Sequence, residues 1–219
     1  KPESGQGFEA ALALAVAKDM GFEGAAVKWV RTDFDSAVAG TADTFDFNLQ
    51  QFTINADREK VVSFSTPYYT ANQAVLGYAT GAGASVKSLA DLKKLKLGAA
   101  AGTTSLQFIT DIIKPDVEPF AFNSNADAKT ALDNKQIDAI VTDLPTALYI
   151  SAVEIEGTKV FGQIPASAGG AGDSWGLLFK KDNPLTECAN LALADLKKSG
   201  DLDKITQQWM ADYTEAGKR

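Results

Sequence analysis

Polar residues at three places in this 219-residue sequence have the types and spacing needed to bind a small charged molecule. The groups are Gln50, Gln51, Thr53 and Arg58; Gly102, Thr103, Thr104 and Ser105; and Asp143. Arg58 stands between two apolar, β-rich runs, and its planar guanidinium suits the two oxygens of a carboxylate. A solvated surface arginine paired with Asp57 or Glu59 is the competing interpretation, because most arginines stay in water.

The other two groups offer complementary chemistry. Residues 102–105 stand where a strand gives way to a helix, whose unpaired amides and positive dipole end favour an anion. Asp143 follows the apolar run 137–141 and could hold an ammonium. Helix capping is the competing interpretation for both features. In combination, the three groups predict a site for a zwitterion, with donors for a carboxylate and an acid for an amine.

The elements that must position these residues alternate between strand and helix. Strands are expected at residues 27–30, 47–51, 61–64, 74–78, 95–99, 118–122, 137–141, 159–162 and 175–180, and helices at 8–20, 88–95, 105–114, 125–134, 144–153, 184–198 and 201–213. Their short connections favour parallel sheets covered on both faces. A glycine-rich stretch at 168–172 interrupts the alternation, so we expect two α/β units, with the chain returning to the first. Ligands of such sheets lie beyond the carboxyl ends of the strands, where the three polar groups fall.

The composition argues against several classes of function. Histidine is absent and Cys188 is the single cysteine, so a hydrolase triad has no base and a His–Cys zinc site cannot form. Cys188 falls in an apolar helical stretch and is expected to be buried. The net charge of −7, with dispersed lysines, argues against nucleic acid or an anionic membrane as a partner. We expect a processed chain with its signal peptide removed, and no metal, cofactor or catalytic residue.

The polar groups belong to a series of segments that covers nearly the whole chain. In order, the segments are GFEAALALAVAKDMGF, DFNLQQFTINADREKVVSFSTPYY, SLADLKKLKLGAAAGTTS, NKQIDAIVTDLPTALY, WGLLFKKDNPL and GDLDKITQQWM. This series resembles the periplasmic amino-acid-binding proteins of ABC importers, the polar amino acid solute-binding proteins of family 3. The resemblance implies an α/β fold of two Rossmann-like lobes joined by two crossing strands, the type II periplasmic binding protein fold. Lobe 1 would hold residues 1–71 and 166–219, and lobe 2 residues 72–165, with the ligand in the cleft.

The resemblance also implies a role for each candidate site residue. Arg58 would bind the ligand α-carboxylate, with Thr53 and the main chain near Gln51 beside it. Thr104, beside Gly102 and Thr103 at its helix start, would reach the same carboxylate from the other lobe, and Asp143 would bind the α-ammonium. The ligand side chain would meet Phe34, Gln50, Ala100 and Ser105. Closure of the lobes on the amino acid would then be read by the membrane subunits of an ABC transporter.

Two departures from the family pattern stand out. Family members begin with a strand and an aromatic-rich turn before the first helix, and this sequence starts after them. Either another segment or chain supplies that strand, or lobe 1 is destabilised by a gap in its sheet with unpaired backbone. Gln50 and Gln51 replace the small hydroxyl residues common in the family, which would shorten the pocket or add hydrogen bonds. A monomer is expected, in the periplasm, or extracellular and membrane-anchored if the source is a Gram-positive bacterium.

Other functions and ligands stay open. An enzyme on the same scaffold, of the cyclohexadienyl dehydratase type, would need Asp143 or Asp33 to move a proton. A sensor module would share the binding site. A neutral or polar amino acid is the favoured ligand; alanines at 99–101 leave room for γ-aminobutyrate, and a basic side chain would need an acid such as Asp33.

Overall fold

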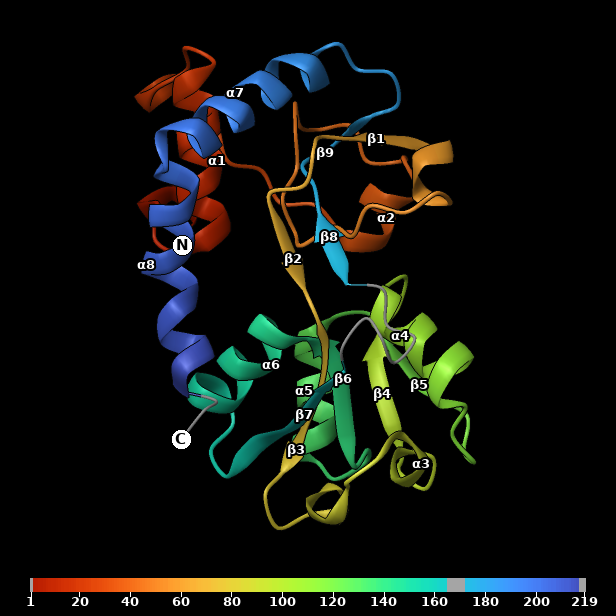
Figure 1. Cartoon of the computed structure of the whole chain (residues 1–219). Helices are drawn as coiled ribbons and strands as arrows, with labels where there is room; N and C mark the ends of the chain where they lie inside the picture. The colour runs from red at the N-terminus through yellow and green to blue at the C-terminus, as the bar shows by residue number, and fades with distance from the viewer. Residues whose placement is uncertain (1, 165–171, 217–219) are drawn as a thin grey trace. The chain divides into compact units, whose positions relative to one another are not determined.

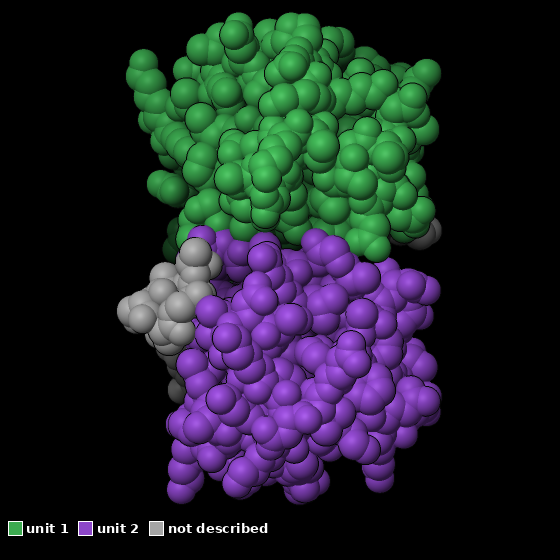
Figure 2. All heavy atoms as spheres, turned by 90° about the vertical axis from the view of Figure 1, so that its right-hand side faces the viewer, with its two compact units in different colours: residues 1–70, 174–212 green, residues 71–173, 213–219 purple. Residues whose placement is uncertain are grey.

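The structure, a computed structural model, describes residues 2–164 and 172–216 and divides into two compact units (Figure 2). Unit 1 comprises residues 1–70 and 174–212, and unit 2 comprises 71–173 together with the C-terminal residues from 213. The chain passes between the units within β2 (Tyr69–Ala71) and returns within β8 (Asp173–Trp175), and these two strands pair with each other. The expected lobes change at 71/72 and at 165/166; the second of these boundaries lies outside the described residues.

Unit 2 is built on a five-stranded sheet with the order β5-β4-β6-β3-β7 (Figure 1). Its strands are β3 (Gln73–Tyr78), β4 (Leu97–Ala100), β5 (Phe120–Phe122), β6 (Ala139–Asp143) and β7 (Thr158–Ile164). β4 is parallel to β5 and β6, whereas β3 runs antiparallel to β6 and β7. The expectation of a parallel sheet is therefore wrong for β3, whose pairings with both β6 and β7 are antiparallel. β3 enters unit 2 at the edge where β6 ends, so it must run in the opposite direction.

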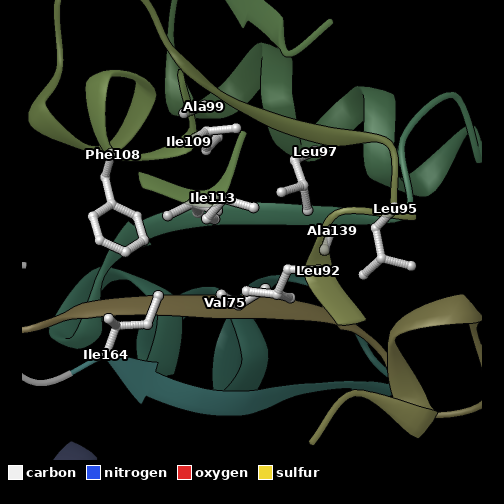
Figure 3. Close-up of a cluster of buried hydrophobic side chains, with 11 residues drawn as sticks. Val75, Leu92, Leu95, Leu97, Ala99, Phe108, Ile109, Ile113, Ala139 and Ile164 are labelled. Atoms are coloured by element: carbon white, nitrogen blue, oxygen red, sulfur yellow. The ribbon is translucent and has the colours of Figure 1, made fainter. Parts of the chain in front are cut away.

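Helices and turns cover both faces of this sheet, as expected. They are η4 (Ala82–Ser85), α3 (Leu89–Leu92), α4 (Thr104–Phe108) continued by the π-helix η5 (Ile109–Ile113), α5 (Asn125–Asp133), and α6 (Leu144–Tyr149) continued by the π-helix η6 (Ile150–Glu154). On one face, Phe108, Ile109 and Ile113 meet Val75 and other sheet residues (Figure 3). Leu76, the next residue of β3, packs in a second cluster on the other face. This alternation follows from the two-residue period of a strand.

Unit 1 contains the two long C-terminal helices and several shorter ones. Its helical elements are η1 (Pro2–Ser4), α1 (Phe8–Asp19), η2 (Gly24–Ala26), α2 (Phe34–Val38), η3 (Arg58–Lys60), α7 (Leu185–Ser199) and α8 (Asp201–Ala216), the last of which runs on into the residues of unit 2. α1 buries Phe8, Leu12 and Val16 and lies against α7. Gly200 ends α7 with φ 77°, a left-handed conformation that glycine adopts without a Cβ clash.

The strands of unit 1 are short and depart from the sequence expectations. β1 (Val62–Phe64) pairs antiparallel with β9 (Leu178–Lys180). Residues 175–180 were expected to form one strand, but they divide between β8 and β9. Residues 27–30 form no strand, and residues 47–51 contribute one isolated bridge, from Asn48 to Leu178. The physical reason is the lack of a neighbour: within the described residues, the backbone amides of 28–33 have no hydrogen-bond partner.

The remaining correction concerns Cys188, which is exposed on α7 rather than buried. The buried stripe of α7 consists of Ala189, Ala192, Leu193 and Leu196. Their spacing is that of one helix face, and Cys188 lies beside that face. Among the described helices, none is both long and apolar enough to cross a membrane.

Candidate functional site

Arg58 in unit 1 is buried, with only 8% of its surface exposed. Its Nη1 donates to the Thr53 carbonyl oxygen at 2.7 Å, and its guanidinium carbon lies 5.4 Å from the centre of the Phe34 ring. Asp57, the alternative partner, instead forms an ion pair with Lys60 at 2.7 Å. The interpretation of Arg58 as a solvated surface arginine is therefore wrong.

The surroundings of Arg58 fix the direction of its guanidinium. The Phe34 ring stacks on Phe52, with ring centres 5.0 Å apart; Phe52 belongs to a buried core cluster of unit 1, and Phe34 packs against that cluster. The Arg58 amide donates to Asn55 Oδ1 at 2.9 Å, which holds the turn that begins η3. A planar cation set against an aromatic face and a carbonyl oxygen has few rotamers left. Three of the predicted site residues, Arg58, Thr53 and Phe34, are thus in contact around the guanidinium.

Gln51 is held by a helix that the sequence interpretation did not connect with the site. Its backbone has φ 54°, a left-handed conformation that is uncommon for residues other than glycine. The Gln51 amide donates to Glu9 Oε1 of α1 at 2.7 Å, and the Tyr68 hydroxyl donates to the same oxygen. Burial raises the pKa of the Glu9 carboxyl, although both hydrogen bonds act to lower it. Glu9 therefore ties the predicted site to the segment just before β2.

Gln50 faces a different set of partners from Gln51. Its Nε2 donates to Thr32 Oγ1 at 2.6 Å and to the Thr32 carbonyl oxygen at 3.2 Å. Asn48 Nδ2 donates to the same hydroxyl at 2.7 Å. These amides and this hydroxyl form a half-buried polar group in unit 1, and they link residues 47–51 to Thr32, which follows the predicted strand 27–30.

In unit 2 the predicted residues gather at one edge of the sheet. Because β4 and β6 are parallel and adjacent, their last residues, Ala100 and Asp143, lie at the same edge. The chain then turns at Gly102, whose φ of 69° is left-handed. Thr103 caps α4: its hydroxyl accepts from the Leu106 amide at 3.2 Å and donates to the Ala100 carbonyl oxygen at 2.6 Å. This capping role was the competing interpretation for that turn.

Thr104 and Ser105 open α4 behind this cap. Thr104 is half-buried, and Ser105 is buried, with its hydroxyl donating to Gln73 Oε1 at 2.7 Å. Gln73 Nε2 donates to Asp143 Oδ1 at 2.8 Å and to Asp173 Oδ2 at 2.5 Å. The register of the sheet explains the first of these bonds, because Gln73 stands directly opposite Asp143.

The sequence analysis did not identify Glu9, Gln73 and Asp173 as residues near the predicted site. Glu9 lies on a helix that was assigned only to the core. Gln73 is the polar residue that opens the apolar strand β3, which is a weak signal for a functional residue. Asp173 follows the glycine-rich stretch, where no pairing could be anticipated.

Two other observations bear on the assignment of a site. A hollow of about 520 Å³ on unit 1 is lined by residues of η3, β1 and the β9–α7 turn, including Glu59, Phe64 and Lys181. None of the predicted site residues lines this hollow; Glu59 is only the sequence neighbour of Arg58. We therefore assign no ligand to it. Among the described residues, no group of three or more acidic or cysteine side chains could hold a metal ion.

Comparison with known proteins supplies independent information. The sequence model of the bacterial extracellular solute-binding proteins, family 3, matches residues 1–212. The chain is 30% identical to ABC transporter arginine-binding protein 1 of Escherichia coli K12, over 93% of this chain and 81% of that protein. It is 31% identical to the ABC transporter glutamine-binding protein GlnH of Bacillus subtilis 168, over 96% of this chain and 76% of that protein.

Solved structures give the same result for the fold. An ancestral arginine-binding protein bound to arginine superposes with a TM-score of 0.80 at 34% identity, covering 93% of this chain and 88% of that one. The ancestral amino acid-binding protein AncCDT-1, described as a precursor of cyclohexadienyl dehydratase, superposes with a TM-score of 0.77 at 32% identity, covering 93% and 84%. The predicted fold class, α/β with two lobes of the type II periplasmic binding protein kind, is thereby confirmed.

Proposed function

Because this chain belongs to the bacterial extracellular solute-binding proteins of family 3, we propose that it binds a free amino acid and delivers it to an ABC importer. Relatives named as arginine- and glutamine-binding proteins of ABC transporters support this assignment. The observation that carries it is the burial of Arg58 in one unit and of Asp143 in the other. Buried charges of opposite sign suit the two ends of a zwitterion.

The ligand α-carboxylate is assigned to Arg58, with Thr53 beside it. The Thr53 carbonyl and the Phe34 ring hold the guanidinium in one plane, which favours a two-oxygen acceptor. Thr104 and the turn at 102–103 are assigned to the same carboxylate from unit 2. Each charge-assisted hydrogen bond contributes about 1.5–3 kcal/mol.

The α-ammonium is assigned to Asp143, at the end of β6 in unit 2. One zwitterion that uses Arg58 and Asp143 draws its binding free energy from both units. Several such bonds formed together are enough to shift an equilibrium between open and closed states that differ by a few kcal/mol. The membrane subunits of the transporter are the proposed readers of the closed state.

The side chain of the ligand is assigned to Phe34 and Gln50 in unit 1 and to Ala100 and Ser105 in unit 2. The Gln50 amide nitrogen is engaged by Thr32, so its carbonyl oxygen is the atom left to accept from a polar ligand. This favours an uncharged or donor-rich side chain, such as that of glutamine or arginine, over an acidic one. The main chain near Gln51 is assigned a supporting role, because its amide is hydrogen-bonded to Glu9.

A thermal-shift screen of the proteinogenic amino acids and γ-aminobutyrate tests the proposal. A binder held in excess raises the unfolding midpoint in proportion to the logarithm of its concentration. We expect at least one polar or basic amino acid to do so. A flat response to every compound, confirmed by calorimetry, would rule out amino-acid binding.

We propose binding rather than turnover as the activity. A dehydratase on this scaffold is the second candidate, supported by the similarity to AncCDT-1. Its proton would have to pass through Asp143, which is held by Gln73, or Asp33, which is exposed at the start of α2. Incubation with prephenate or arogenate decides between the two, because product formation above the uncatalysed rate would establish the enzyme.

We also propose that unit 1 accepts a further extended segment along residues 28–33. The six amides of this stretch have no hydrogen-bond partner among the described residues, and its side chains are exposed except for the half-buried Trp29 and Thr32. Extended backbone with unpaired amides resembles the free edge of a sheet. Native-state hydrogen exchange tests this, on protein that analytical sedimentation has first verified to be monomeric. We expect the amides of residues 28–33 to exchange faster than those of β4 and β6. Slow exchange there would count against a free edge.

A periplasmic or extracellular location follows from the family and is proposed for this chain. Membrane anchoring is the form expected in a Gram-positive bacterium. Fractionation of the source cells, with the protein released by osmotic shock or retained on the membrane, separates the two cases.

A further inference from the structure

Gln73 is the centre of a network of four buried polar side chains in unit 2. Its own exposed fraction is 3%, and those of Ser105, Asp173 and Asp143 are 5%, 5% and 9%. Gln73 Nε2 donates to Asp143 Oδ1 at 2.8 Å and to Asp173 Oδ2 at 2.5 Å, and Gln73 Oε1 accepts from Ser105 Oγ at 2.7 Å. These residues come from β3, β6, β8 and α4, so the network joins four elements at the site edge.

The orientation of the Gln73 amide follows from its partners. An amide has two N–H donors and a carbonyl acceptor. Rotating it by half a turn would set its oxygen against both carboxylates and its nitrogen against Ser105, which loses two charge-assisted hydrogen bonds. Both donors of Gln73 are therefore committed to the two acids.

The donors and acceptors already used within the network also determine which kind of ligand group can bind to it. Ser105 has one hydroxyl proton, and it is directed at Gln73, so the remaining capacity of Ser105 is as an acceptor. The oxygens of Asp143 and Asp173 are acceptors as well. A group that binds here must bring several N–H donors and a positive charge, and a primary ammonium has both.

Asp173 differs from Asp143 in its place in the chain. It is the first residue of β8 and the last residue of unit 2 before the chain returns to unit 1. No ion pair of Asp173 is present among the described residues. A buried carboxylate held by a neutral amide gains most from the arrival of a cation.

We infer that Asp173 is a second carboxylate for the α-ammonium of the ligand, and that Gln73 is the positioning residue that holds Asp143 and Asp173 together when no ligand is bound. The inference rests on the proposed function and deepens it at the amine end. The ammonium takes up hydrogen bonds with both acids that the Gln73 amide otherwise satisfies. The sequence alone assigned the amine to Asp143.

Calorimetry on the full chain with Asp173→Asn tests the inference, with L-arginine and L-glutamine as probes. Their deamino analogues, 5-guanidinopentanoic acid and 4-carbamoylbutanoic acid, lack only the ammonium. Asp133→Asn is the matched control, because it removes the same charge from an exposed residue of unit 2. We expect Asp173→Asn to lower the affinity for whichever amino acid binds by about 10- to 100-fold and to leave the affinity for its deamino analogue unchanged. Asp133→Asn should bind both compounds with the affinity of the parent.

Equal affinity of Asp173→Asn and the parent for the amino acid would overturn the inference, and so would equal losses for the amino acid and its deamino analogue. If the variant does not fold, the side-chain amide resonances of Gln73 in the parent decide. They must shift when the amino acid saturates the protein, and unchanged resonances would overturn the inference. If the parent binds neither probe and no compound of the thermal-shift screen, the proposed function is overturned, and this inference with it.

Discussion

At the scale of single residues, the chemistry of the proposed site depends on the burial of its charged side chains. Arg58 is ordinary in sequence, but the Thr53 carbonyl and the Phe34 ring hold its guanidinium out of water. Asp143 is buried as well, and it accepts a hydrogen bond from the Gln73 amide. Groups held in this way have lost their rotamer freedom before a ligand arrives, so binding costs less entropy.

Arg58→Lys tests whether the shape of the cation matters as well as its charge. The ammonium of lysine keeps the positive charge but cannot bind a carboxylate with two parallel N–H bonds. We expect the affinity for the amino acid, measured by calorimetry, to fall by about tenfold or more. Arg31→Lys, an exposed arginine of unit 1, is the control, and equal affinities of the two variants would contradict the assignment.

Glu9 gives a prediction for stability as a function of pH. Burial raises the pKa of its carboxyl in the folded chain above 4.5, so the folded state favours the protonated form. The stabilisation from protonated Glu9 is complete below that value and is lost as the pH rises through the raised folded pKa. The glutamine of Glu9→Gln cannot titrate. We therefore expect the unfolding free energy of this variant, minus that of the parent, to increase as the pH rises from 4.5; this increase is the gain.

The gain should amount to about 1.4 kcal/mol for each pH unit by which the folded pKa exceeds the unfolded one. Urea denaturation of both proteins at a series of pH values between 4 and 8 measures it, and the other acids cancel in the difference. A difference that does not vary with pH would show that Glu9 titrates normally.

At the scale of elements, β3 is the strand on which both faces of unit 2 depend. A Cβ on Gly77 would lie 2.7 Å from the Asp138 carbonyl oxygen and 2.8 Å from the Phe161 ring, whereas a Cβ on Gly162 of β7 would meet nothing within 4 Å. Gly77→Ala should therefore destabilise the protein by about 1–3 kcal/mol through overpacking. Gly162→Ala should be neutral or slightly stabilising.

Chemical denaturation of these two alanine variants checks the packing of the central sheet. The substitution is the same and the strands are adjacent, so differences in chain entropy largely cancel. Equal stability of the two variants would mean that the close approach of Gly77 to Asp138 is relieved at no cost.

The elements that could be predicted are those whose signals are local. The helix expected at 88–95 begins where predicted, as α3, because Ser88 and Asp91 form a capping box within one turn. Residues 27–30 carry the alternation of a strand, but a strand also requires a neighbour, and no local pattern reveals its absence. Gln73 was missed for a related reason: its partners Asp143 and Asp173 are 70 and 100 positions away in sequence.

At the scale of the whole molecule, the chain consists of two units that each have a core and each carry half of the proposed recognition chemistry. Unit 1 supplies the enclosed guanidinium, and unit 2 supplies the carboxylates and the helix start at Thr104. In the proposed assignment one ligand uses residues of both units, so we expect the response to the ligand to be a property of the whole chain. The family and its fold class were predicted from the order of the segments, while the identity of the amino acid was not.

Isothermal titration of the amino acid found in the screen, with the parent, Arg58→Ala and Asp143→Ala, tests amino-acid binding at Arg58 and Asp143 most directly. Arg31→Ala and Asp133→Asn are the controls for loss of charge in each unit. We expect a single site in the parent, a loss of about 10- to 100-fold in each site variant, and parental affinity in both controls. Parental affinity in Arg58→Ala or in Asp143→Ala would contradict the zwitterion assignment.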